Sequence, residues 1–528
     1  MAIRCGNGRM VHTRSKVQRN TVKKLVVPSV IIGATGGIIY IIDNTLYSSL
    51  LTRSIRAIYI LLWIAYQYGY NIQNYASIEE LHEIASESLL QLLLENKGLY
   101  IKIGQAIANQ GELFPIAYQK RFQRLYDNAP FDDWYKINST LSKNLGVNYE
   151  TLKFESIDHN PIASASIAQV HKAKLKNGDS VALKVQHHYI KNQIVVDLYV
   201  YKLITKVYEK VFDLPLSMLT EYVSQQLQKE TDFEHEMSNS IKMSDIIASD
   251  PDLNNIKIPK NYPSLTTSQV LTAEWIDGIS LVNKQDLINN GYDIKLMMNQ
   301  YINLFNKQIF KYGFIHSDPH PANLKVNRNS KGKQQLVLLD HGLYIQLTPG
   351  FRLQYCQLWK EIFSLNTNGI SKIGRSWGIN SIDLFATLIS MRPINIKNGD
   401  IKSDTRDISD LLKNFISDES KFPRELPFLA RTMRMIQNLN QTMGSPVNRI
   451  NLLTNEAINC LFNQKLLSWF DYFDLIKIKM NLVISNLVFY LIRFKQFIYK
   501  DKKNVKGLED YIELYMANTA KSIGINWI

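Results

Sequence analysis

Polar side chains gather on a proline-flanked loop in the middle of the chain, FIHSDPHPANLKV at residues 314–326. Asp318 and Asn323 lie five residues apart on it, and Asp340 follows at the end of the apolar stretch QLVLLD. This is the order HxDxxxxN, then DxG, of kinase-like phosphotransferases. The phosphates of a nucleotide need a divalent cation, and Mg²⁺ prefers oxygen ligands. We predict that Asn323 and Asp340 hold Mg²⁺ beside ATP, and that Asp318 orients or deprotonates a hydroxyl or a water.

One such loop alone is more often a solvated turn, but both pieces in this order, with a strand before the second, indicate a phosphotransferase site. A lysine that could reach the phosphates lies upstream in VALKVQ: Lys184 follows the Asn-Gly hairpin signal at 177–178. Apolar neighbours on both sides predict that Lys184 forms a buried ion pair with a helix carboxylate. The segment LQKETDFEHEMSN offers several acids, and local sequence does not choose among them: Glu230, Asp232, Glu234 and Glu236.

The glycine-rich phosphate loop of kinases is replaced by ASASIAQVH at 163–171. Small side chains there still let the backbone approach phosphates, although the loop is stiffer than a glycine loop. The predicted phosphate-binding residues are Ala163, Ser164, Ala165 and Ser166. We expect EWIDG (274–278) to connect two lobes, with the backbone of Glu274 and Ile276 at the adenine. The sequence GxxxxGK[ST] does not occur, which argues against a P-loop enzyme.

The segment after Asp340 is short, because a helix is predicted to begin near Pro349. There is no A-P-E sequence and no long activation segment to dock a peptide. We therefore expect a small-molecule or lipid substrate, or ATP hydrolysis coupled to a conformational change.

The elements that must position these residues are mostly helical. Residues 45–145 show apolar side chains at helical spacing, and Ser77 with Glu80 forms a capping box. Residues 150–190 alternate as strands do, and 268–278 and 335–340 read as further strands. A mainly helical chain with one small sheet is an α+β arrangement.

The whole chain of 528 residues carries a net charge of +14, which indicates an anionic partner: phosphate, anionic lipid or nucleic acid. Its three cysteines are far apart in sequence, so we expect neither a disulfide framework nor a zinc site. The basic stretch at 493–507 is expected to be a solvated helix end or, next, a contact for anionic lipid head groups; no nucleic-acid binding is predicted.

The first 25 residues contain seven Lys or Arg and no acid, as a mitochondrial presequence does. The alternative is a basic tail that binds nucleic acid. The uncharged run VVPSVIIGATGGIIYII follows, and residues 26–44 are predicted to form a transmembrane helix. The positive-inside rule then places the protein in the mitochondrial inner membrane as a single-pass protein, with its C-terminal part facing the intermembrane space. Two later apolar stretches, 57–66 and 481–492, are expected to be core or interfacial helices.

Four segments resemble the UbiB family of ADCK-type atypical kinase-like proteins over roughly residues 75–350: KIGQ (102–105), the alanine-rich loop, ETD (230–232) and HSDPHPAN. The DHG sequence at 340–342 is similar to the mitochondrial subgroup, with His341 in place of phenylalanine, and Ala322 replaces a usual glycine. The resemblance implies an α+β, protein-kinase-like bilobal fold. Its expected parts are a presequence (1–25), a membrane helix (26–44), a helical KxGQ extension (45–148), an N-lobe (149–278), a C-lobe (279–400) and C-terminal helices (401–528).

The resemblance also implies roles for these residues. Lys102 and Gln105 would face the nucleotide pocket, held by Glu230 and Asp232, and Lys184 would pair with Glu236. Family members use ATP with Mg²⁺ and serve coenzyme Q or lipid homeostasis, which implies inner-membrane lipids and coenzyme Q or a related isoprenoid as partners. A homodimer is a further assembly that the sequence leaves open. The alternative function is a nucleotide-gated module that binds or moves lipid without phosphotransfer. KIGQ and ASIAQVH argue against a small-molecule kinase of the aminoglycoside or choline type.

Overall fold

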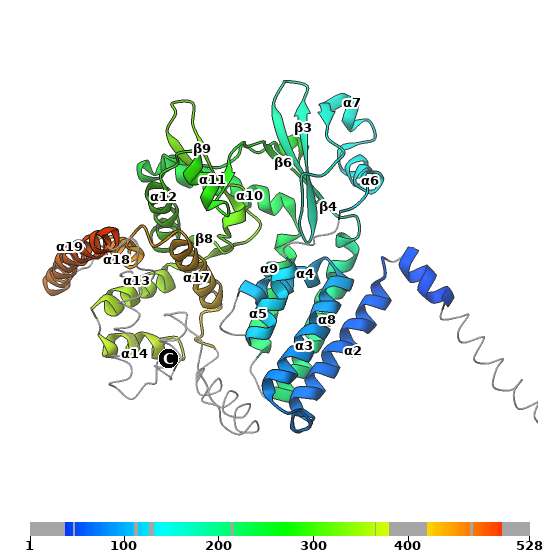
Figure 1. Ribbon diagram of the computed structural model, residues 1–528, viewed down its shortest axis with the longest axis horizontal. Helices are drawn as coiled ribbons and strands as arrows, with labels where there is room; N and C mark the ends of the chain where they lie inside the picture. The colour runs from blue at the N-terminus through cyan, green and yellow to red at the C-terminus, as the bar shows by residue number, and fades with distance from the viewer. Residues whose placement is uncertain are drawn as a thin grey trace, which may run out of the picture.

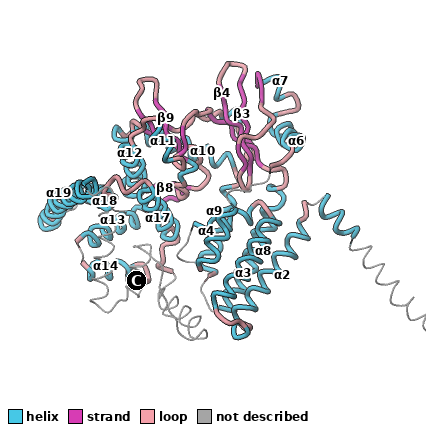
Figure 2. Tube along the Cα trace, viewed as in Figure 1, coloured by secondary structure: helices cyan, strands magenta, loops and turns pink. Residues whose placement is uncertain are grey.

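The structure is a computed structural model that describes residues 37–45, 48–109, 115–125, 131–212, 216–364, 366–379, 420–464 and 468–498. A strand-rich lobe and a helix-rich lobe lie next to each other, and a bundle of long helices lies below the first (Figure 1). Figure 2 shows strands mainly in two groups toward the top of this view, with helices beneath both. The expected presequence (1–25) lies outside the described residues, as does the expected membrane helix as far as residue 36.

The N-lobe is built on one antiparallel sheet in the order β1-β3-β4-β6, with β2 paired to β3. Its strands are β1 (Phe154–Ile157), β2 (Ala163–Ser164), β3 (Ala168–Leu175), β4 (Ser180–Gln186) and β6 (Val270–Glu274). The predicted hairpin at 177–178 is confirmed, and its glycine has φ of 90°, which a residue without Cβ adopts freely. In β4, Val181, Leu183 and Val185 point into the core, so Lys184 points to the opposite face.

Helices cover both faces of this sheet. On the core side lie α6 (Trp134–Leu145) and α7 (Tyr149–Lys153). On the Lys184 side lies α10 (Phe233–Ser249), whose Phe233 packs against Ala168 and Leu271. Asp232 caps α10 by accepting a hydrogen bond of 3.0 Å from the backbone N–H of Glu234.

The helical extension is built from helices that precede β1 in the sequence and from two helices that lie between β4 and β6. Its helices are α2 (Leu50–Gly69), α3 (Ile78–Asn96), α4 (Leu99–Asn109), α5 (Ile116–Phe122), α8 (Ile190–Phe212) and α9 (Ser217–Glu230). The predicted start of α3 is confirmed, because the backbone N–H of Glu80 donates to the Ser77 hydroxyl at 3.3 Å. Arg53 and Asp197 form a buried ion pair of 2.5 Å that links α2 to α8. Two segments pack across the expected domain boundaries: α6 packs on the N-lobe sheet, and α8 packs with the extension.

The C-lobe contains two further sheets. The first has the order β5 (Ile256–Lys257), β10 (Gln334–Leu338), β9 (Leu324–Arg328), β7 (Ile279–Ser280), and the second pairs β8 (Phe314–His316) with β11 (Tyr344–Gln346). They pack with α11 (Lys284–Asn289), α12 (Ile294–Asn306) and the π-helical turn η5 (Lys307–Tyr312). The expectation of one small sheet was therefore wrong: strands of two to five residues are too short to show a period of two. Short 3₁₀ turns are η1 (Ile72–Asn74), η2 (Gln123–Leu125), η3 (Pro251–Leu253), η4 (Pro263–Leu265) and η6 (Pro321–Asn323).

The C-terminal helices complete this lobe. They are α13 (Pro349–Phe363), α14 (Thr367–Ser376), α17 (Leu426–Thr442), α18 (Arg449–Phe462) and α19 (Trp469–Ile498). The predicted helix at Pro349 is confirmed, and the Thr348 side chain caps it. Cys356 on α13 and Cys460 on α18 are both buried free thiols.

The apolar stretch 481–492, expected to be too short to span a membrane, lies inside the 30-residue helix α19. Within the described ranges, Trp469–Lys495 is the one helix that is by itself long and apolar enough to cross a membrane. The short helix Gly37–Thr45 and α2 meet the combined requirement of length and apolarity only as a pair bent by 110°.

Candidate nucleotide site

The Lys184 side chain meets Glu236, one of the four acids that local sequence left open. Both carboxylate oxygens of Glu236 lie 2.8 Å from Lys184 Nζ, and the Glu236 side chain is 2% exposed. Burial raises the pKa of Glu236 to about 7; Lys184 opposes this shift and Asp340 adds to it. Burial alone would lower the pKa of Lys184, but the carboxylates of Asp340 and Glu236 outweigh it and raise that pKa. Lys184 is therefore a fixed cation that faces the C-lobe.

Asp340 lies across the cleft, where β10 ends. Its Oδ1 is 3.8 Å from Lys184 Nζ and accepts a hydrogen bond of 3.0 Å from the backbone N–H of Gly342. Burial would raise the pKa of Asp340, but Lys184 and Lys102 lower it, so the carboxylate is ionised. Asn323 is joined to the same turn, because its carbonyl accepts a hydrogen bond of 2.9 Å from the N–H of Leu339.

Asn323 and Asp340 supply the kind of oxygen donors that Mg²⁺ takes, so these residues fit the predicted metal. In the described part of the chain, no group of three His, Cys, Asp or Glu side chains is placed to hold a metal ion. Two protein ligands suit a cation that arrives with a nucleotide, since phosphate oxygens and water complete its coordination.

His316 holds the HxD loop against the Asp340 turn. One ring nitrogen lies 2.8 Å from the carbonyl oxygen of Asp340, and the other accepts a hydrogen bond of 3.0 Å from the Asp318 N–H. The adjacent His341 is buried, and its ring contacts the Tyr344 hydroxyl at 3.0 Å. Burial, with His316 adding to it, lowers the pKa of His341 to about 3, so this ring is neutral where kinases have phenylalanine.

The KxGQ helix α4 reaches this cleft. Lys102 forms an ion pair with Glu230, and its Nζ lies 3.7 Å from Asp318 Oδ2. Gln105 donates a hydrogen bond of 3.1 Å to the carbonyl of Leu125. The acid two positions after Glu230, Asp232, caps α10 as described above. The structure therefore brings Lys102 to Asp318, and Glu230 holds it there.

Arg431, which lies 113 residues beyond Asp318 on α17, was not among the predicted site residues. Its Nη2 lies 3.0 Å from Asp318 Oδ1, and its side chain is 8% exposed. Burial would raise the pKa of Asp318, but Arg431 and then Lys102 lower it. A signal was present in the sequence: an arginine inside the apolar run LPFLARTMRMI needs an acidic partner when that helix face is buried.

The alanine-rich loop is well anchored. Ala163 and Ser164 pair with β3, and the Ala165 N–H donates to the Ala168 carbonyl at 2.7 Å. Ser166 is buried. At the connector, the Glu274 carboxylate pairs with Lys257 at 2.5 Å, and the Ile276 carbonyl accepts a hydrogen bond from Lys325 at 3.1 Å. The roles predicted for these residues at a nucleotide stay predictions.

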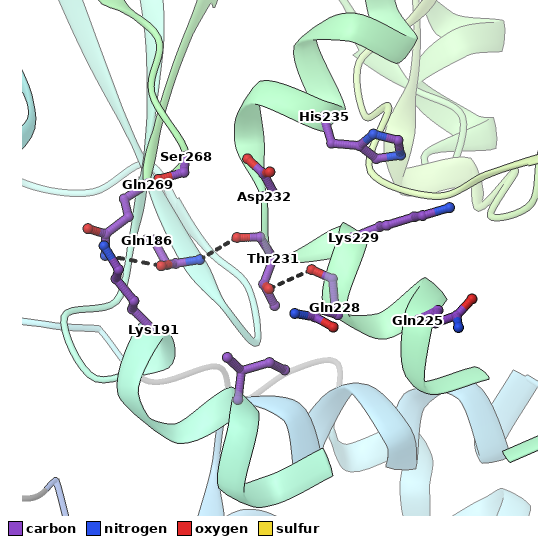
Figure 3. A pocket seen from close by; sticks show the side chains of 11 residues that line it. Gln186, Lys191, Gln225, Gln228, Lys229, Thr231, Asp232, His235, Ser268 and Gln269 are labelled. Carbon is purple, nitrogen blue, oxygen red and sulfur yellow. Dashed lines mark hydrogen bonds between the residues drawn. The ribbon is translucent and has the colours of Figure 1, made fainter. Parts of the chain in front are cut away.

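A cavity of about 470 Å³ lies where the end of β4 and the start of β6 meet the junction of α9 and α10 (Figure 3). Gln186 crosses one side of it and donates to the Thr231 carbonyl at 2.9 Å. Of the predicted site residues, only Asp232 lines this cavity, so it is distinct from the cleft between Lys184 and Asp340.

A sheet lobe with a lysine–glutamate pair, facing a helical lobe with an HxDxxxxN loop and an Asp–Gly turn, defines a protein-kinase-like α+β fold. The ABC1 atypical kinase-like domain matches residues 124–374. The ABC1 family protein lscO of Purpureocillium lilacinum is 33% identical over 470 residues, 80% of this chain and 79% of its own length. The ABC1 family protein C10F6.14c of Schizosaccharomyces pombe is 34% identical over 460 residues, 84% of this chain and 85% of its own.

AarF domain-containing kinase 1 of Drosophila melanogaster is 35% identical over 324 residues, 60% of this chain and 61% of its own length. The chain belongs to the ABC1 atypical kinase-like family. This confirms the predicted membership in the UbiB family of ADCK-type proteins, and it confirms the predicted fold class.

Proposed function

We propose that this protein is an atypical kinase or ATPase that uses Mg-ATP and serves coenzyme Q or another lipid at the mitochondrial inner membrane. The observation that carries the proposal is that Lys184 Nζ meets Asp340 Oδ1 at 3.8 Å across the cleft, beside the loop that holds Asp318. Asp318 itself lies between two cations, Lys102 and Arg431. A peptide hydroxyl would have to displace Lys102 from Asp318 and Glu230 before it reached the carboxylate. Water or a small substrate needs less room, so hydrolysis or small-molecule phosphorylation fits better than protein phosphorylation.

Each residue has a role in this scheme. Lys184, fixed by Glu236, would contact the phosphates of the nucleotide, and Asp318 would orient the attacking hydroxyl or water. Asn323 and Asp340 would hold Mg²⁺, which neutralises phosphate charge when bound. The backbone of the alanine-rich loop would lie over the phosphates from the N-lobe side.

The test is the release of ADP by the purified full-length protein, with and without anionic liposomes and quinone-like compounds. We expect turnover that needs Mg²⁺ and that Asp318→Asn lowers by on the order of a hundredfold or more. Val147→Ala, at an exposed position away from the cleft, is the matched control. Zero turnover under every condition would overturn the catalytic proposal.

A second candidate is a nucleotide-gated module that binds or moves lipid without a phosphotransfer product. The pairing of Asp318 with two cations favours it, because these stabilise the ionised carboxylate and make it a weak proton acceptor. A nonhydrolysable ATP analogue separates the two candidates. If the analogue supports lipid transfer at the rate seen with ATP, turnover is unnecessary and the module is correct.

We also propose that the protein is a single-pass inner-membrane protein whose large domain faces the intermembrane space. The basic, acid-free start of the sequence supports this orientation. Protease added to mitoplasts should digest the domain. A domain that stays protected until detergent is added would place it in the matrix and overturn the orientation.

A further inference from the structure

The largest run of exposed apolar side chains belongs to α19, at the edge of the C-lobe (Figure 1). Side chains at helical spacing form what we call the outer face of α19: Phe473, Met480, Ile484, Leu487, Leu491 and Phe494. Leu487, near its middle, is 61% exposed. Exposed apolar patches of this extent mark a contact surface in soluble and membrane proteins alike.

The opposite face of α19 is tied to the C-lobe. Leu475, Ile478 and Leu482 belong to the core of that lobe. Asn451 on α18 donates a hydrogen bond of 2.9 Å to the carbonyl of Leu482. Lys479 donates to Asn455 at 2.6 Å and to Asn459 at 2.5 Å. A helix held in this way cannot cross a bilayer without carrying the polar groups of α18 into the hydrocarbon, where burying them is costly.

The charge of α19 indicates what covers its outer face. The four cations of α19 are Lys477, Lys479, Arg493 and Lys495, and its two acids, Asp471 and Asp474, both lie before Leu475. Lys477 and Lys495 are eighteen residues apart, about five helical turns, so both border the same edge of the outer face. Both residues are exposed.

A second copy of the chain fits this surface less well. Pairing two α19 helices through their outer faces would bring the exposed Lys477 and Lys495 of both copies to the edge of one interface. In an antiparallel pair centred on Asn486, Lys477 of one copy lies opposite Lys495 of the other, and like charges there repel. An anionic lipid surface instead offers hydrocarbon to the outer face and negative head groups to both lysines.

We infer that α19 lies in the plane of an anionic membrane surface, with its outer face in the acyl boundary, and docks the C-lobe on lipid. This surface is separate from the nucleotide cleft, so lipid docking and nucleotide turnover can fail independently.

The test measures how deep α19 lies. Full-length protein with Cys5→Ser, reconstituted in vesicles, receives a fluorophore at Phe473→Cys, Ile484→Cys or Phe494→Cys, with Val147→Cys in the N-lobe as the control position. Nitroxide lipids of different depth quench the label, in vesicles of phosphatidylcholine with or without phosphatidylglycerol. We expect all three α19 labels at one shallow depth only when phosphatidylglycerol is present, and no quenching at residue 147.

A label at 484 much deeper than those at 473 and 494 would mean that α19 spans the bilayer, and would overturn the inference. Equal quenching without anionic lipid, or none with it, would do the same. A shift in the emission of the fluorophore that occurs without vesicles and grows with protein concentration would also overturn the inference, since it indicates that a second copy covers the outer face. Lys477→Gln with Lys495→Gln should weaken the anionic response by about tenfold or more, whereas Lys206→Gln with Lys210→Gln on α8 should leave it unchanged.

Discussion

Arg431 is the residue whose replacement tests the site most directly. At an effective dielectric constant of about 20, a unit charge pair at 3.0 Å is worth about 5.5 kcal/mol and one at 3.7 Å about 4.5 kcal/mol. Arg431 therefore supplies slightly more than half of the cationic field at Asp318, and Lys102 the rest. Breaking a buried pair completely costs about 3–5 kcal/mol. Because Lys102 remains, we expect Arg431→Gln to lower the free energy of unfolding by about 2 kcal/mol.

The same change alters the pH dependence of activity. Burial alone would raise the pKa of Asp318, and Arg431 and Lys102 hold it down. A lowered carboxyl pKa contributes stability above the unfolded value of about 3.9, and this is lost as pH falls through the folded pKa. Without Arg431 the folded pKa rises, so the acid limb of the pH–rate profile for ATP hydrolysis should move to higher pH.

Arg431→Lys keeps the charge and should keep the acid limb near its original position. Arg424→Gln, at an exposed arginine just before α17, controls for the lost charge alone. If the Arg431→Gln profile falls by the same factor at every pH, Arg431 acts on phosphate or substrate directly, and the argument through Asp318 is wrong.

Three further predictions concern the cleft and the helix that closes it. A Cβ at Gly104 would overlap Leu125 and lie 2.6 Å from Leu93 Cδ1, so Gly104→Ala should cost about 1 kcal/mol of stability after its gain in helix propensity; an unchanged urea midpoint would contradict this packing. The raised pKa of Glu236, about 7, lets the folded state bind a proton that the unfolded chain releases near about pH 4.3. Stability should therefore fall as pH rises from about 4.3 to about 7. Glu236→Gln should flatten the plot of Tm against pH in this window, and a wild-type Tm that does not change there would mean that the pair is ionised throughout. ATP with Mg²⁺ at a hundred times Kd should add about 2.7 kcal/mol to the free energy of unfolding of the wild type, seen as a rise in Tm. Asp340→Asn should abolish this rise, and an equal rise in the variant would exclude Asp340 as a metal ligand.

Much of the fold follows from local pattern. The Asn-Gly turn, the capping box at Ser77 and the helix start at Pro349 each depend on a few adjacent residues, and all three lie where sequence places them. Of the C-lobe strands, β10 was predicted from its apolar run, and the other five were missed, because two to five residues carry too little periodicity. The extent of α19 was missed because polar residues interrupt its apolar run, while its opposite face packs on α18.

The sequence by itself determined which residues are predicted to carry the chemistry of the candidate site, since a phosphate-handling loop needs its aspartates and asparagine at fixed spacing along one stretch of chain. Only the tertiary structure decided which partners these residues meet. Four acids within seven residues compete for Lys184, and the phase of α10 against β4 selects Glu236. No local pattern brings Arg431 to Asp318, because their contact depends on how α17 packs against the C-lobe.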